Sequence, residues 1–302
     1  MAPSSTQANI PTRSVSYSGS VVRRFHCNQT GRDFVVGDLH GAYDLLQSAL
    51  ASVGFCFGKD RLFCVGDLAD RGRRSNDVLP FLDWLDAGGG GSVRGNHEVM
   101  LIDLYTGPTP ASRDEHDVLR KNGMDWLLDL DLAQRVTIAN AFAALPLAIE
   151  VETPCGTVGI VHADVPHRMT WGEFTDILKR KEKDGEFADI AEYALWSRLR
   201  IERGIRQPVV GIDAVFVGHS PVEEPITLGN VHFIDTGAAF GDLTQNPQCG
   251  VLTMVEITAI HPGEMASFSV AAHSQTFLSG RGDPPCRPCA GRNRANGNRR
   301  PH

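Results

Sequence analysis

The sequence lacks several features that would assign it to particular classes of protein. It has no run of about 18 consecutive apolar residues, so we expect no transmembrane helix. No hydrophobic segment near its start resembles a secretory signal. Its 7 cysteines are odd in number and scattered, which does not suit a disulfide scaffold. These absences favour a cytoplasmic protein that is not attached to a membrane.

An excess of positive charge is also absent. The chain has 29 Lys and Arg against 36 Asp and Glu, a net charge of −7, so we expect no nucleic-acid partner. Arginine gathers only near the end, beside Cys286 and Cys289. A lone C-x-x-C pair has too few neighbouring ligands for a zinc site, so the roles of the pair and of the arginines stay open.

Short apolar runs that end in Asp, Asn or His recur five times along the chain. Each run is rich in β-branched or aromatic residues, which is typical of a buried strand. In open α/β sheets, ligands bind beyond the carboxyl ends of the strands. The polar residues that follow the runs are Asp38 and His40, Asp67, Asn96, His162 and His219. We therefore expect these side chains to face one crevice.

The segments around these runs alternate between strand and helix patterns. We expect a hairpin from residues 21–25 and 33–36, and we expect Ser75 to cap a helix. Residues 99–147, broken at Gly107–Pro110, and residues 172–203 are predicted to be mostly helical. The remaining expected elements are a helix at 42–53 and strands at 62–65, 92–94, within 147–161, and at 214–217, 231–235, 251–257 and 267–271.

Oxygen and imidazole ligands without a thiolate indicate Mn, Fe or Zn rather than a Cys-type structural zinc site. Six ligands are too many for one ion that keeps a position open for water. We assign Asp38 and His40 to one ion. Asn96, His162 and His219 are assigned to a second, with Asp67 bridging the two. Two such ions can hold a hydroxide that attacks phosphorus directly.

Other residues of the same motifs then acquire roles in phosphoester cleavage. His97 adjoins a ligand and is placed to protonate the leaving alkoxide, with Asp70 fixing its tautomer. Arg71, Arg94 and Arg198 are candidates for binding phosphate oxygens, because a guanidinium fork matches two of them.

Each residue also has a structural interpretation. An Asp in a Gly-Asp-Leu turn can serve an Asx-turn, and a single histidine can be a satisfied core residue. Arg71 could have no other role than an ion pair with Asp67 or Asp70, and Arg198 could be a surface helix residue. Because five motifs share one arrangement, we favour the metal site.

These motifs resemble those of the metallophosphoesterase superfamily and, within it, the PPP-type phosphatases. The family pattern GDxHG, GDxxDRG and GNHE occurs here in order at Gly37–Gly41, Gly66–Gly72 and Gly95–Glu98. The likeness is greatest to the compact bacterial and bacteriophage lambda type and covers about residues 21–257. It includes Asn122-Gly123 with Trp126, Trp196 with Arg198, and Ile234–Ala238.

The resemblance implies an α/β fold with a central β-sandwich of mixed sheets flanked by α-helices. It also implies a dinuclear site, commonly Mn-activated, with the ligands and roles assigned above. We expect a disordered leader at 1–20, a catalytic domain at 21–275 with a helical insertion at about 99–147, and a disordered Arg-rich tail at 276–302. Ser220 stands where Thr is frequent in the family.

The expected activity is metal-dependent hydrolysis of phosphoserine and phosphothreonine in proteins or peptides, with phosphotyrosine left open. The alternative is a dinucleoside tetraphosphate hydrolase or another small-molecule phosphoesterase. Relatives of the tetraphosphatase kind usually lack an Asp at the position of Asp70 and carry Asp in place of Glu98. A non-catalytic scaffold is disfavoured because every expected ligand is present. The sequence does not indicate the oligomeric state.

Overall fold

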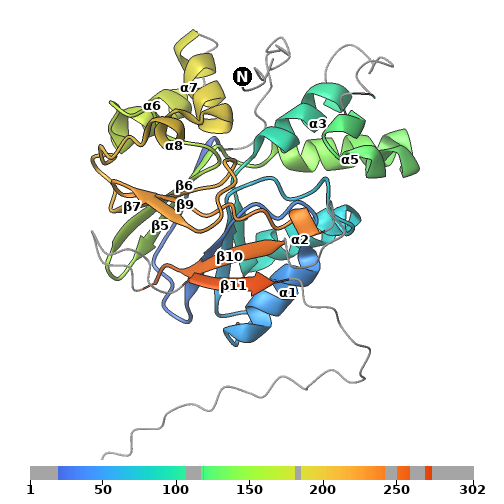
Figure 1. Ribbon diagram of the computed structural model, residues 1–302, viewed down its shortest axis with the longest axis horizontal. Coiled ribbons are helices and arrows are strands. Elements are labelled where there is room, and N and C mark those ends of the chain that lie inside the picture. The colour runs from blue at the N-terminus through green and yellow to red at the C-terminus, as the bar shows by residue number, and fades with distance from the viewer. Residues whose placement is uncertain are drawn as a thin grey trace, which may run out of the picture.

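Two β-sheets pack face to face in the computed structural model, with helices on both outer sides (Figure 1). The structure describes residues 20–106, 117, 119–180, 185–241, 250–258 and 269–273. Apart from Ser20, the expected leader, the expected tail with Cys286 and Cys289, and the break at 107–110 all lie outside these residues.

The first sheet has six strands in the order β1-β5-β6-β7-β9-β8. These strands are β1 (Val22–Phe25), β5 (Ala148–Thr153), β6 (Gly156–Val161), β7 (Ala214–Val217), β9 (Val231–Phe233) and β8 (Ile226–Leu228). Strands β6, β7 and β9 run parallel, so their carboxyl ends meet at one edge.

The second sheet has five strands in the order β11-β10-β2-β3-β4. They are β11 (Ser269–His273), β10 (Val251–Glu256), β2 (Asp33–Val36), β3 (Arg61–Cys64) and β4 (Gly90–Ser92). Strands β2, β3 and β4 are parallel in the βαβ arrangement that the sequence predicts, whereas β10 is antiparallel to β2.

Helices cover the outer face of each sheet and complete three apolar layers. The second sheet packs against α1 (Tyr43–Ser52), α2 (Val78–Trp84), α3 (Asn96–Thr106) and α5 (Leu132–Ala143). The first sheet packs against α6 (Trp171–Arg180) and α7 (Gly185–Trp196), which α8 (Leu199–Arg203) follows. Short turns η1 (Ser75–Asp77), η2 (Leu85–Gly89) and η3 (Asp125–Asp129) connect elements. Val35 and Phe63 face Ile149 and Ile160 between the sheets.

The prediction of a hairpin from residues 21–25 and 33–36 is wrong. β1 pairs in parallel with β5, and β2 pairs with β3 and β10 in the other sheet. The Asn28 side chain holds the connection, because its Oδ1 accepts from the N–H groups of Thr30 and Gly31 and its Nδ2 donates to Lys59 O. A Cβ on Gly31 would lie 2.3 Å from Lys59 O, so this close approach requires glycine.

Two further expectations differ from the structure. Ser75 does not cap a helix, because it begins η1 and its Oγ donates to Gly72 O at 2.9 Å. Strand β8 has no counterpart among the expected strands and forms by pairing with β9. The strands at 147–161 do form the expected antiparallel pair, with Thr153 opposite Gly156. None of the helices within the described residues has the length and apolar composition needed to span a bilayer.

Candidate dinuclear metal centre

Six side chains expected to bind metal converge at the carboxyl edge of the two sheets. Asp38 and His40 follow β2, Asp67 follows β3, Asn96 begins α3 after β4, His162 follows β6 and His219 follows β7. All six are buried, with exposed fractions of at most 7%. The backbone N–H of His219 donates to both carboxylate oxygens of Asp38, at 3.2 and 3.1 Å, and so joins the two sheets at the site.

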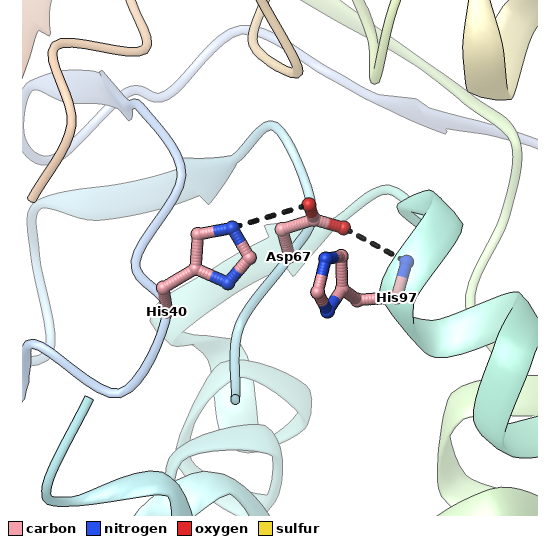
Figure 2. Close-up of side chains that lie close together, drawn as sticks. All are labelled: His40, Asp67 and His97. Carbon is pink, nitrogen blue, oxygen red and sulfur yellow. Dashed lines mark hydrogen bonds and ion pairs between the residues drawn. The ribbon is translucent and has the colours of Figure 1, made fainter. Parts of the chain in front are cut away.

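Asp67 lies at the centre of the group. Its Oδ2 is 3.4 Å from His40 Nε2 and its Oδ1 is 3.5 Å from His162 Nε2. Two sets of potential ligands, His40-Asp67-His97 and Asp38-Asp67-His162, each have their ligand atoms within 4.8 Å of one another. Figure 2 shows the Asp67 carboxylate between His40 and His97. Because Asp67 belongs to both sets, its position suits a carboxylate shared by two ions.

Asn96 lies against the imidazoles of His162 and His219. Its Oδ1 lies 2.8 Å from His162 Nε2 and 2.9 Å from His219 Nδ1. Backbone carbonyls orient the rings from the other side. His162 Nδ1 is 2.8 Å from Val65 O, His219 Nε2 is 3.2 Å from Trp196 O, and His40 Nδ1 is 3.0 Å from Ala69 O. A ring N–H directed at a carbonyl leaves the opposite nitrogen available as a ligand.

Burial sets the charge of these groups. It lowers the pKa of His40, His162 and His219, so the imidazoles are neutral, as a metal ligand must be. Burial, together with the charges of Asp235 and Asp67, raises the pKa of Asp38. Crowded buried carboxylates beside neutral imidazoles form a site whose charge a cation would balance.

The loops that carry these ligands have unusual backbone geometry. Within the described residues, the non-glycine residues with positive φ are His40, Asp67, Asp70, Arg71 and His219. Glu98 stabilises the Asp67 loop, because its Oε2 accepts from the N–H groups of Asp67 and Gly95 and its Oε1 from that of Leu68. Strained conformations of this kind persist where surrounding contacts fix them, and they cluster at functional sites.

His97 and Asp70 form a buried pair beside the centre. His97 Nδ1 is 2.7 Å from Asp70 Oδ2, and both side chains are at most 3% exposed. Burial alone would lower the pKa of His97, but the carboxylates of Asp67 and Asp70 outweigh it and raise that pKa. Arg71 connects two of the histidines, with Nη1 2.7 Å from His40 Nε2 and Nη2 2.8 Å from His97 Nε2.

The other two arginines differ in their surroundings. Arg94 is 1% exposed, and its Nη2 donates to the carbonyls of Ala143 and Leu145 at the end of α5. Arg198 is partly exposed and precedes α8, and its charge lowers the pKa of His219 and His162. Arg198 therefore lies within electrostatic range of the centre.

Comparison with known proteins assigns this constellation to a family. The sequence profile described as calcineurin-like phosphoesterase matches residues 34–235, which span every potential ligand. The chain belongs to the calcineurin-like phosphoesterase family. The family fold has mixed sheets flanked by helices, so the fold class expected from the sequence is confirmed. The protein is a phosphoesterase, and divalent metal binding follows from the family together with the ligand clusters.

The similar proteins within this phosphoesterase family include both protein phosphatases and dinucleoside tetraphosphatases. The chain is 32% identical to serine/threonine-protein phosphatase 1 of Salmonella typhimurium over 227 residues, which cover 73% of this chain and 93% of the relative. It is 36% identical to a symmetrical bis(5'-nucleosyl)-tetraphosphatase of Enterobacter, covering 70% and 89%. A protein serine/threonine phosphatase from Saccharomyces cerevisiae shares the fold, with a TM-score of 0.51, 16% identity and coverage of 88% and 86%.

The donor chemistry of this phosphoesterase fits divalent metal ions. Two ligand clusters share Asp67. The imidazoles of His40, His162 and His219 are neutral, and each has one ring nitrogen at a backbone carbonyl and the other available as a ligand. Thiolates do not contribute to these clusters, so the set favours ions that accept oxygen and nitrogen ligands.

Three residues near the centre were not among the predicted site residues. Asp235 follows β9 and is 4% exposed, and burial raises its pKa to about 6. Its position after a buried strand is the signal shared by the predicted ligands. Glu98 supports the Asp67 loop, as described above. Trp126 donates from Nε1 to Asp70 Oδ1 at 2.7 Å, a contact that no local sequence pattern indicates.

Proposed function

We propose that this phosphoesterase is a metal-dependent phosphomonoesterase that hydrolyses phosphoserine and phosphothreonine in proteins or peptides, with phosphotyrosine left open for the test below. Support comes from the match to serine/threonine-protein phosphatase 1 across nearly all of that relative. The observation that carries the proposal is the Asp70–His97 contact of 2.7 Å, because it supplies a proton donor beside the proposed metal ligands.

Two divalent ions, Mn in our proposal with Fe and Zn as alternatives, would bind at the ligands that surround Asp67. His97 lies close to His40 and Asp67 but is assigned as the acid and not as a ligand. Asp38 and His40 would hold one ion, Asn96, His162 and His219 the other, and Asp67 would contact both. When bound, such a pair supplies an activated water and neutralises phosphate charge.

His97 acts as the general acid in this proposal. Hydrolysis adds water across the ester, so the P–O bond breaks and the departing oxygen must gain a proton. Protonated His97 would give its Nε2 proton to that oxygen, while Nδ1 stays bonded to Asp70. Because a guanidinium only donates, Arg71 would have to turn from His97 Nε2 to the phosphoryl oxygens for His97 to carry this proton. Asp70 is not a proposed ligand, so its effect on His97 does not depend on metal.

Arginine side chains would bind the phosphoryl oxygens. Both Nη atoms of Arg71 lie at the centre, where they contact His40 and His97, and the same pair of atoms turned to phosphoryl oxygens would make a bidentate contact. The backbone carbonyl of Arg198 accepts from the N–H of Glu202, but its side chain has no hydrogen-bond or ion-pair partner within the part of the chain that the structure describes, so the guanidinium is available to a ligand. Arg94 is the third proposed contact, and the carbonyls of Ala143 and Leu145 orient its guanidinium.

The chemistry of the leaving group separates this proposal from the tetraphosphatase alternative. A serine or threonine alkoxide is a poor leaving group and needs a proton, whereas a nucleotide phosphate can depart as a stable anion. A buried Asp–His pair therefore benefits an alkyl phosphoester most. The alternative retains support from the relative that is 36% identical.

The test compares kcat/KM of the Mn-loaded protein on a phosphoserine peptide, a phosphotyrosine peptide and diadenosine tetraphosphate. We expect the phosphoserine peptide to be the best substrate, with activity lost in chelator and restored by Mn. A higher kcat/KM on diadenosine tetraphosphate would replace the proposal with the tetraphosphatase activity. Absence of activity on all three substrates would indicate a non-catalytic scaffold.

A further inference from the structure

Asp70 receives one donor on each of its two oxygens. Oδ2 lies 2.7 Å from His97 Nδ1, and Oδ1 accepts from the indole N–H of Trp126 at 2.7 Å. Asp70 is 2% exposed, so water cannot readily replace either partner. The indole bond thus fixes the rotation of the carboxylate about its own axis, and with it the direction of the oxygen that holds His97.

The segment that carries Trp126 is anchored on both sides. Met124 and Leu127 are fully buried in the apolar layer under the second sheet, and they flank Trp126 in the chain. The backbone N–H of Arg71 donates to Gly123 O at 2.8 Å. Gly123 has φ of +74°, and a Cβ there would lie 2.9 Å from Arg71 Cα, so the two backbones touch. Two independent contacts therefore tie residues 123–126 to Asp70 and Arg71.

These contacts act on a strained part of the chain. Asp70 and Arg71 are consecutive non-glycine residues with φ of +75° and +67°. An isolated loop would relax from this conformation, at a gain of about 1 kcal/mol or more per residue. Relaxation of the loop would break the contacts of Asp70 and Arg71 with the 123–126 segment. These contacts therefore help to keep the Asp70 side chain in one orientation.

Resting on the proposed function, we propose that Trp126 is a positioning residue for the general acid. It orients the Asp70 carboxylate so that His97 is held with Nε2 toward the departing oxygen of the substrate. Trp126 itself contacts neither phosphate nor proposed metal ligand in this assignment. Its contribution is therefore confined to reactions in which the leaving group needs a proton.

The experiment measures leaving-group dependence in Trp126→Phe, which removes the N–H and keeps an aromatic ring. We expect kcat on a phosphoserine peptide to fall about tenfold, with KM and bound metal unchanged. On 2,4-dinitrophenyl phosphate, whose leaving group needs no proton, kcat should stay within about twofold. In a His97→Asn background, Trp126→Phe should cause no further loss, because the two residues act as one unit.

Trp171→Phe is the matched control. Trp171 also donates its indole N–H to a buried carboxylate, Glu150 Oε1, at 2.8 Å, but it lies in α6 away from His97. The control should cost stability without changing the ratio of the two kcat values.

Equal losses on both substrates in Trp126→Phe, or additive losses with His97→Asn, would overturn the inference while the wild-type activity stands. A wild-type protein that cleaves neither ester would overturn the proposed function and this inference with it.

Discussion

Side chains at the centre are constrained by their backbone as much as by their chemistry. Five non-glycine residues of the site have positive φ, a conformation that costs an L-residue with a Cβ about 1–2 kcal/mol. Glu98 offsets part of this cost at Asp67 by accepting three backbone N–H groups. Burial and the Asp67 charge raise the pKa of Glu98 to about 7, which means that ionising Glu98 here costs free energy. The protein keeps this buried acid at a position where it holds the Asp67 loop in place.

Replacing His97 tests the proposed acid. In His97→Asn we expect kcat on a phosphoserine peptide to fall by about 10²–10⁴-fold, because the alkoxide would leave without a proton. Metal content should remain at the wild-type value, since Asp38, Asp67 and Asn96 are unchanged. Steady-state kinetics and elemental analysis of the same preparation measure both quantities. Full activity in the variant would show that another group donates the proton.

Replacing Asp67 tests the shared carboxylate. Asp67→Asn removes one negative charge from both clusters, so we expect bound metal to fall well below two ions per chain. Asp33→Asn is the control, because Asp33 is equally buried in β2 but pairs with Arg61 at 2.7 Å, away from the centre. An unchanged metal stoichiometry in Asp67→Asn would refute the bridging role.

Elements differ in how far their position could be predicted from sequence. The strand ends that bear Asp38, Asp67 and His219 were predictable, because each buried strand is a local apolar run followed by a polar residue. The pairing of β1 was not, because four residues of a short strand do not encode their partner, and Asn28 and Gly31 direct the chain across to Lys59. Pairing between distant segments is decided by packing that one segment does not contain.

The same limit applies to the site. The proposed ligands all follow short apolar strands, so their convergence at one edge of the sheets was predictable. The indole of Trp126 reaches Asp70 from 56 residues away, and it is placed there by the packing of Met124 and Leu127 and by the bond from Arg71 N–H to Gly123 O. Ser75 matched a helix cap in composition, but the turn before α2 uses its hydroxyl for Gly72 O.

Strand β9 carries a buried histidine away from the proposed ligands that should make stability pH-dependent. His232 is 7% exposed, its ring stacks on Phe216 with centroids 4.8 Å apart, and Nδ1 is 2.9 Å from Thr227 Oγ1. Burial lowers the pKa of His232 from 6.5 to about 4. The unfolded chain thus gains a proton on this residue before the folded chain does. The contribution of neutral His232 to the free energy of unfolding is full above pH 6.5 and is lost as the pH falls toward 4.

Between pH 7 and pH 5 this effect should remove about 2 kcal/mol from the free energy of unfolding. Urea denaturation of the wild type and of His232→Gln at both pH values measures it. Glutamine can still bond to Thr227 but does not titrate, so the variant should lose less stability over the same range. Equal losses in the two proteins would assign the pH dependence to other groups.

The whole molecule is two sheets joined at a site to which both contribute. Asp38, His40, Asp67 and Asn96 come from the second sheet and the elements that follow its strands, and His162 and His219 from the first. Removing metal should therefore lower the stability of the entire domain as well as its activity. Mn at a concentration 100 times its Kd should restore about 3 kcal/mol.

Thermal unfolding of chelated protein with and without added Mn measures this effect. Asp67→Asn is the control, and Mn should shift its midpoint little. A wild-type midpoint that does not respond to Mn would mean that the ligand clusters bind Mn weakly.

The bond from His219 N to the Asp38 carboxylate links residues 181 positions apart. Ions held by ligands from both sides of this junction would act as a reversible cross-link that closes a very long loop. Such a link mainly restricts the unfolded ensemble, and its effect grows only slowly with loop length. Metal supply would then shift the fraction of chains that are folded, before any substrate is met.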